Sequence, residues 1–162
     1  MTVDSLDKLL VDELKDLYSA EKQITRALPK MAKAASSSDL RTAFETHLKE
    51  TEGQIQRLDR VFEILGKSAS GKTCKAMKGL IEEGSEVMEQ TEGEARDAAM
   101  ISAAQKVEHY EMAGYGSVRT WAETLGQNEI ANLLQQTLDE EGETNKKLTS
   151  IASKINKQAK AA

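Results

Sequence analysis

Apolar residues recur every three or four positions over most of this chain, and this spacing limits the fold more than any other feature. Such spacing places the apolar side chains on one face of an α-helix. Long stretches of this kind cover about residues 4–34, 38–65, 94–125 and 128–157, and a shorter stretch covers about residues 75–90. The pattern predicts an all-α chain of two long helical hairpins, joined by a crossover that contains one extra shorter helix.

Cap residues and helix breakers set the expected ends of these helices. Asp4 suits the N-cap of the first helix, and Ser38 or Asp39 suits the N-cap of the second. Gly66 is expected to end the second helix. Pro29 is expected to kink the first helix or restrict its last turns, because proline lacks a backbone N–H. The segment GKSASGKT is polar and contains glycine, so we interpret it as the crossover loop.

Composition restricts the organisation and the partners of the chain. A length of 162 residues with 39% hydrophobic residues favours a single domain over residues 1–162. A net charge of −5 argues against a nucleic-acid surface, which needs clustered Lys and Arg. No apolar run approaches membrane-spanning length, and the N-terminal MTVDSLDKLL lacks the pattern of a signal peptide. We therefore expect a cytoplasmic protein with neither a membrane nor a nucleic-acid partner.

The cysteine and the histidines restrict any metal site. Cys74 is the one cysteine, which excludes an intrachain disulfide and a multi-cysteine zinc site. His47 and His109 are the two histidines. Any metal site in this chain must therefore be built mainly from carboxylates.

The two hairpins share a pattern at an offset of 90 residues. This offset places Glu21 on Glu111, Glu50 on Glu140, and a series of apolar residues of the first hairpin on apolar residues of the second. Sequence identity between the halves is low, so we interpret the match as a repeat of pattern. The turn, the apolar stripe and the two glutamates nevertheless coincide without a gap.

Several glutamates fall on or near the faces that the apolar residues mark as interior. Glu21 and Glu111 lie near the centre of matched stripes on the first and third long helices, with Glu108 beside Glu111. Glu141 lies close to the centre of its stripe, whereas Glu50 lies at an edge. Glu140 is placed like Glu50, and Glu143 projects away from the interior.

Buried carboxylates need compensation, because an ionised group in an apolar interior costs several kcal/mol. Arg119 is the one candidate counterion near these faces. Two divalent cations would balance four carboxylates, and one glutamate from each of four helices is an arrangement found in bundle dimetal sites. The alternative is that glutamates at an edge, such as Glu50 and Glu140, reach out to water. His47 by itself is more typical of a hydrogen-bonded core histidine than of a metal ligand.

Aromatic residues outside the inner faces suggest a subunit contact. Trp121, Tyr110 and His109 are expected on the outer surface, which favours a homodimer. Tyr18 and Tyr115 are expected near the proposed site, where they can pack or supply hydroxyl hydrogen bonds.

Four phrases in order resemble the YciF-type bacterial stress-protein family over almost the whole chain. The phrases are DLYSAEKQITRALPKM, HLKETEGQIQRL, KVEHYEMAGYG and LDEEGETNKKL. The resemblance implies a ferritin-like four-helix bundle with an extra helix, a homodimer, and a dimetal centre of the rubrerythrin and ferritin kind. It implies metal ligands at six positions: Glu21, Glu50, Glu111 and Glu140, with Glu108 and Glu141 as additional carboxylates.

One departure from the ferritin-like pattern affects the expected metal. The Glu-x-x-His motif is absent, since Gly53 and Glu143 stand three positions after Glu50 and Glu140. Gln54 or His47 is a candidate for the place of the missing histidine on the second helix, and on the fourth helix Thr144 corresponds to Gln54. An oxygen-rich site of this kind suits Mn or Mg as readily as Fe.

Two functions follow as hypotheses. The first is a stress-associated protein with a carboxylate-bridged di-iron or di-manganese centre that handles peroxide, oxygen or Fe(II), with an unknown redox partner. The alternative is a non-enzymatic helical protein, protective under stress or acting through interactions, which keeps the scaffold without a working metal site. Iron storage is a third possibility, which requires assembly into a large hollow shell.

Overall fold

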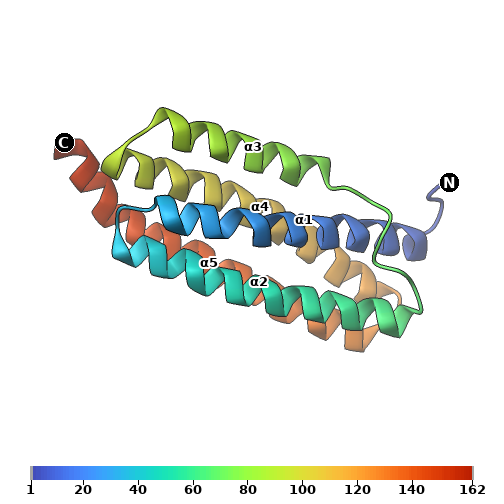
Figure 1. The fold of residues 1–162 in the computed structure, drawn as a ribbon. Helices are drawn as coiled ribbons and strands as arrows, with labels where there is room; N and C mark the ends of the chain where they lie inside the picture. The colour runs from blue at the N-terminus through green and yellow to red at the C-terminus, as the bar shows by residue number, and fades with distance from the viewer. Residues whose placement is uncertain (1, 162) are drawn as a thin grey trace.

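Five helices make up the computed structural model, which describes residues 2–161. They are α1 (Leu6–Ala34), α2 (Ser38–Leu65), α3 (Lys75–Gln90), α4 (Gly93–Thr124) and α5 (Asn128–Ala161). In Figure 1, α1 and α2 form one hairpin and α4 and α5 form the other, while α3 lies along the outside of α1 and α4. The predicted all-α class, with two hairpins, a crossover and one extra shorter helix, is confirmed.

The helix ends differ from the predictions by small shifts. Ser5, rather than Asp4, is the N-cap of α1, and its side chain accepts a hydrogen bond from the backbone N–H of Lys8. Ser37 caps α2 through the N–H of Leu40. Gly66 ends α2 as predicted, in the left-handed conformation at φ 62°.

Aliphatic and aromatic side chains form two clusters that lie on either side of a polar layer. One cluster contains Leu28, Phe44 and Met100, and the other contains Leu14, Leu58 and Val118. Along α1, Glu21 stands between Leu17 of the second cluster and Ile24 of the first. Each of the other three bundle helices likewise places buried polar residues between its contributions to the two clusters. The buried glutamates therefore lie in the middle of the bundle, away from both ends.

A buried aspartate joins the two hairpins at one end of the bundle. The side chain of Asp97 on α4 accepts hydrogen bonds from the backbone N–H groups of Ser36 and Ser37, at 2.9 and 2.7 Å. These N–H groups belong to the turn between α1 and α2, where a helix start leaves them without helical partners. The contact fixes the first hairpin against α4.

The extra helix covers a residue that we expected on the outer surface. Tyr110 donates a hydrogen bond to Asp16 and lies 3.1 Å from the sulfur of Cys74, the N-cap residue of α3. Tyr110 is therefore half-buried rather than fully on the outer surface, because its hydroxyl contacts α1 and the start of α3, and its part in a subunit contact stays a prediction. His109 is exposed as expected, and Trp121 is half-buried.

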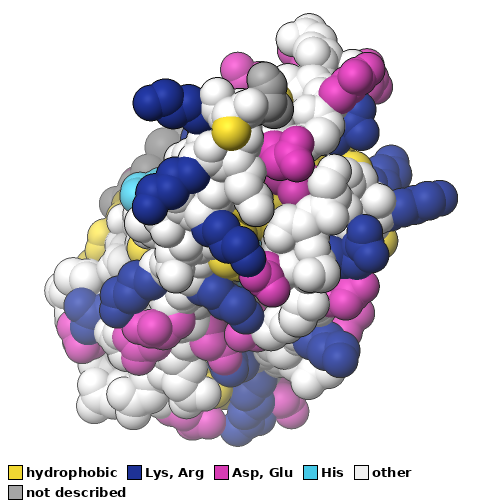
Figure 2. Space-filling model, turned by 90° about the vertical axis from the view of Figure 1, so that its left-hand side faces the viewer, with side chains coloured by type: hydrophobic (Ala, Val, Ile, Leu, Met, Phe, Trp, Pro, Cys, Tyr) yellow, Lys and Arg dark blue, Asp and Glu magenta, His cyan; other side chains and the backbone are white. Residues whose placement is uncertain are grey.

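The length and apolarity of the helices bear on whether the chain spans a membrane, and the face in Figure 2 shows how charge is distributed at one end. Within residues 2–161, none of the helices has an apolar stretch long enough to cross a bilayer. The face in Figure 2, at the end where the C-terminal part of α5 lies, shows Lys and Arg interspersed with Asp and Glu.

Candidate metal centre

Five ionisable side chains from four helices meet in the middle of the bundle. Glu21 comes from α1, His47 from α2, Glu108 and Glu111 from α4, and Glu141 from α5. All five are buried, and none is more than 6% exposed. Glu108 and Glu111 share one face of α4 because they are three residues apart.

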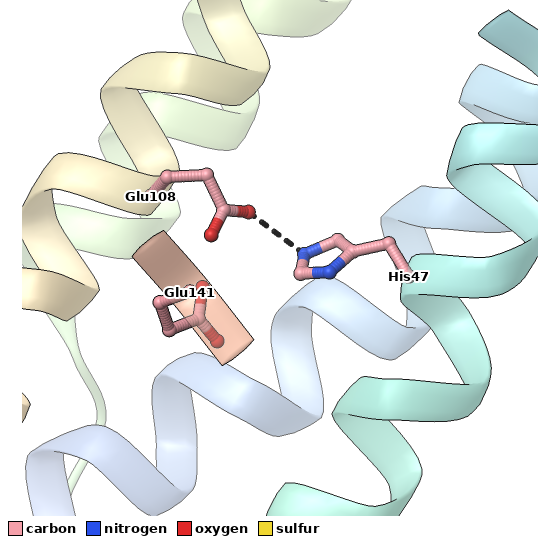
Figure 3. A group of neighbouring side chains, drawn as sticks. All are labelled: His47, Glu108 and Glu141. Carbon is pink, nitrogen blue, oxygen red and sulfur yellow. Dashed lines mark ion pairs between the residues drawn. The ribbon is translucent and has the colours of Figure 1, made fainter. Parts of the chain in front are cut away.

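The five residues form two groups that share one member. His47, Glu108 and Glu141 each place a ligand atom within 4.8 Å of the others, and so do Glu21, Glu111 and Glu141. Figure 3 shows the first group, in which the side chains of three different helices point toward one another. Glu141 therefore lies where its carboxylate can serve both groups.

One hydrogen bond and one ion pair hold parts of this cluster. The hydroxyl of Tyr115 donates to Oε1 of Glu21 at 2.6 Å. Nε2 of His47 lies 2.8 Å from Oε1 of Glu108. These bonds fix one oxygen of each glutamate and leave the second oxygen of each free to bind something else.

Six buried carboxylate oxygens in the described part of the chain have no hydrogen-bond partner in this cluster. They are Oε2 of Glu21, Oε2 of Glu108, and both oxygens of Glu111 and Glu141. Buried polar groups in native proteins are almost always paired, and each unpaired one costs free energy. The donor set, with carboxylate oxygens and one imidazole, is one that Fe and Mn accept. These residues therefore fit a divalent metal centre.

The pKa values show how strongly the interior opposes charge in the absence of a cation. Burial is the main cause that raises the pKa of Glu21, to about 7. Burial and the neighbouring carboxylates raise the pKa of Glu111 and of Glu141 well above the usual range. Burial opposes protonation of His47, but the adjacent Glu108 outweighs it and raises the pKa of the imidazole. A bound cation would remove this penalty by stabilising the ionised carboxylates.

Glu50 lies outside both groups, at the edge of the bundle. Its side chain is 37% exposed and accepts a hydrogen bond of 3.2 Å from Thr144. One of its oxygens lies 3.7 Å from Nδ1 of His47, and this contact is the main cause that lowers the pKa of Glu50.

Glu140 also lies outside both groups, because Arg57 of α2 holds it. Arg57 donates to both oxygens of Glu140, at 2.5 and 2.8 Å, and Gln54 donates to Glu140 at 3.0 Å. Arg57 was not predicted as a counterion, and Arg119, which was, pairs instead with Glu123 on its own helix. The ligand roles predicted for Glu50 and Glu140 remain predictions.

The structure separates the two candidates for the missing histidine. Gln54 faces Glu140, whereas His47 joins Glu108 and Glu141. The 90-residue repeat obscured His47, because it aligns this residue with Thr137 and therefore gives it no counterpart. Its position one turn before Glu50, further toward the interior, was the available signal. Glu143 is exposed and pairs with Lys146, as its predicted outward direction requires.

The fold and this cluster together define a class: helical bundles that enclose a carboxylate-rich centre between two hairpins. Residues 5–161 match the family described as a domain of unknown function, DUF892. The chain belongs to this family.

Similar proteins and solved structures support the family resemblance inferred from the sequence. The chain is 51% identical over 162 residues to Protein YciF of Escherichia coli (strain K12), and the match covers 98% of each. The crystal structure of the E. coli stress protein YciF matches with a TM-score of 0.92 at 50% identity, covering 96% of this chain and 99% of that chain. YcfI from Rhodopseudomonas palustris, described as a proposed structural protein, matches with a TM-score of 0.88 at 44% identity, covering 91% and 94%. The predicted YciF-type family is therefore confirmed.

Proposed function

We propose that this chain is a stress-associated dimetal protein in which Glu21, His47, Glu108, Glu111 and Glu141 hold two divalent cations. The observation that carries the proposal is the set of six buried, unpartnered carboxylate oxygens around Glu141. Four carboxylates carry the charge that two divalent cations balance. The proposed set differs from the one implied by the resemblance, because it includes His47 and leaves Glu50 and Glu140 outside.

The residues of the chain have distinct roles in this proposal. Glu141 belongs to both groups and is suited to bridge the two cations. Tyr115 fixes the orientation of Glu21, and the contact with Glu108 fixes the orientation of the His47 ring. The apolar clusters on either side of the polar layer keep bulk water away from the centre.

Iron or manganese bound there would supply one-electron chemistry toward dioxygen, peroxide or Fe(II). The protein contributes a dry, carboxylate-rich pocket, in which electrostatic interactions are stronger than in water. Tyr115 stays protonated, because burial and the nearby glutamates raise the pKa of its hydroxyl well above the usual range. It is therefore placed to donate a hydrogen bond to a ligand of the centre throughout the working pH range.

A non-enzymatic role is the alternative, and one observation favours it: the relative YcfI is described as a proposed structural protein. In this alternative the inner glutamates are protonated, and the bundle acts through its stability or its surface. A homodimer is part of both proposals, with the exposed His109 and the half-buried Trp121 on the surface available for contact.

Metal titration of the chelator-treated protein tests the proposal. Mn²⁺, added under exclusion of oxygen, is expected to bind at about two ions per chain, as in other two-metal sites. Glu141→Gln is expected to reduce the stoichiometry, because both groups lose a shared ligand. Glu143→Gln is the matched control, since this neighbouring glutamate is exposed. Wild-type protein that binds no Mn²⁺ and no Fe(II) would favour the structural alternative.

A further inference from the structure

A cavity with several polar residues in its lining lies beside the candidate centre, between α2 and α5. Its volume is about 350 Å³, and its lining includes Glu50, Thr144 and Lys147 together with His47. His47 also belongs to one of the two candidate metal groups. The cavity and the candidate centre therefore share a wall residue.

The imidazole of His47 has one side toward each compartment. Nε2 lies 2.8 Å from Glu108 in the interior, and Nδ1 lies 3.7 Å from Oε2 of Glu50 in the cavity. Nδ1 is buried and has no hydrogen-bond partner. A polar atom of a buried side chain is thus aimed at the cavity without a partner, which marks this spot as a place for a ligand.

Glu50 is the carboxylate of this cavity that lies beside His47, whereas Glu143 in the same lining pairs with Lys146. The carboxylate of Glu50 is partly exposed, and the hydrogen bond from Thr144 orients it. A cation that leaves water must exchange its hydration shell for protein oxygens. The oxygens of Glu50 and Thr144 can replace water ligands at the mouth, before the cation reaches the buried carboxylates.

A second cavity at the centre is unsuited to a cation. It has a volume of about 30 Å³, and apart from His47 and Glu108 its lining is apolar, including Ile24, Leu28 and Val107. Transfer of an ion through such surroundings carries a large desolvation cost. The polar cavity between α2 and α5 is therefore the better route.

We propose that divalent cations enter the buried centre through the cavity between α2 and α5, with Glu50 as a transient ligand that passes them to the group of His47, Glu108 and Glu141. The inference rests on the proposed function, because it requires a centre that binds metal. It gives Glu50 a role in the rate of loading and none in the final coordination.

The test is the rate at which chelator-treated protein takes up Co²⁺ at low ionic strength. Samples are quenched with excess chelator at successive times, and protein-bound cobalt is counted by elemental analysis. Glu50→Gln is expected to slow loading by about tenfold, because local charge raises the rate at which a cation is captured. Lys147→Gln is expected to accelerate loading, since Lys147 places a positive charge at the same cavity.

Glu140→Gln is the matched control. Glu140 corresponds to Glu50 in the 90-residue repeat and is similarly exposed, at 30%, but Arg57 already neutralises it. This variant is expected to load at the wild-type rate, and all three variants are expected to reach the wild-type stoichiometry.

Three possible results distinguish a failure of the proposed entry route from a failure of the proposed metal centre. Equal loading rates for Glu50→Gln and wild type would overturn the route while the proposed function stands. A lower final stoichiometry for Glu50→Gln would also overturn it, because Glu50 would then be a permanent ligand. Wild-type protein that takes up no cobalt, manganese or iron would overturn the proposed function, and the route with it.

Discussion

Tyr115 of α4 donates a hydrogen bond of 2.6 Å to Oε1 of Glu21 on α1, which joins the two hairpins at the level of the candidate metal centre. Both residues are fully buried. The bond therefore links the two hairpins. It also fixes Oε1 of Glu21 and leaves Oε2 without a partner, in a carboxylate that lies beside Glu111 and Glu141.

Replacing Tyr115 with Phe should weaken both the link between the hairpins and the orientation of Glu21. The loss of a buried hydrogen bond to a carboxylate is expected to lower the free energy of unfolding by about 1.5–3 kcal/mol. Loss of a group that orients a ligand typically lowers metal affinity by about 10- to 100-fold. Urea unfolding and Mn²⁺ titration measure the two effects. In a Glu21→Gln background the effect of Tyr115→Phe should shrink, and equal effects in both backgrounds would contradict the coupling.

The metal-free protein should lose stability as the pH rises from 5 to 8. Burial raises the pKa of Glu21 from 4.5 to about 7, so the folded protein holds a proton that the unfolded chain has released. The stability from this group is fully present below pH 4.5 and is lost as the pH rises through about 7. The shift corresponds to about 3 kcal/mol. His47 acts in the same direction, because Glu108 raises the pKa of its imidazole against the effect of burial.

Urea midpoints of chelator-treated protein between pH 5 and pH 8 measure this loss. Glu21→Gln should make the profile less steep, since the amide does not titrate, while His47, Glu111 and Glu141 keep their contributions in the same direction. Saturating Mn²⁺ should add more stability at pH 8 than at pH 5, because ionised carboxylates bind the cation and bound ligand stabilises the folded state. A metal-free profile that rises with pH over this range would contradict the account.

Replacing Glu111 with Gln should stabilise the metal-free protein at pH 8. Both oxygens of Glu111 are buried without partners, and the neighbouring glutamates add repulsion. The amide neither ionises in the interior nor has to hold a proton at pH 8, so the change is expected to raise the free energy of unfolding by about 1–3 kcal/mol. The same change should abolish stabilisation by Mn²⁺. Glu143→Gln, at an exposed position, should alter neither quantity. Destabilisation by Glu111→Gln in chelator would contradict the prediction that this buried carboxyl group costs stability in the metal-free protein.

The close approach of α4 to α1 beside the centre depends on Gly114. A Cβ atom added there would lie 2.8 Å from Cδ2 of Leu17, which is fully buried. At Gly116 an added Cβ would meet nothing within 4 Å. Gly116→Ala should stabilise the helix by about 1 kcal/mol. Gly114→Ala should be less stable than Gly116→Ala by about 1–3 kcal/mol, because of overpacking. Equal urea midpoints would show that Leu17 adjusts freely.

Helical periodicity was sufficient to predict the architecture of this chain. The apolar stripes and breakers located all five helices, because each long helix buries one face and therefore repeats its apolar residues at 3.6-residue spacing. The ends were less predictable, since Ser5 and Ser37 compete with neighbouring polar residues as caps. Tyr110 was misplaced because a pattern within one helix does not show that α3 covers it.

The apolar stripes also predicted which glutamates point inward, and all four are buried: Glu21, Glu108, Glu111 and Glu141. The stripes did not predict which side chains pair between helices. Pairing of Arg57 with Glu140, and of His47 with Glu108, depends on the register between helices, which the sequence of one helix does not encode. The repeat also suggested the same role for Glu50 and Glu140. Their surroundings differ, because Glu50 lines a cavity whereas Glu140 pairs with Arg57.

The most direct test of the dimetal proposal combines elemental analysis of protein purified without chelators with anomalous diffraction at the middle of the bundle. The account predicts about two transition-metal ions per chain, as in other two-metal sites, with anomalous peaks between Glu21, Glu111 and Glu141 and between His47, Glu108 and Glu141. It also predicts their loss when Glu21 and Glu111 are both replaced by Ala. Protein that contains no metal, shows no anomalous peak there, and keeps its stability in chelator would contradict it.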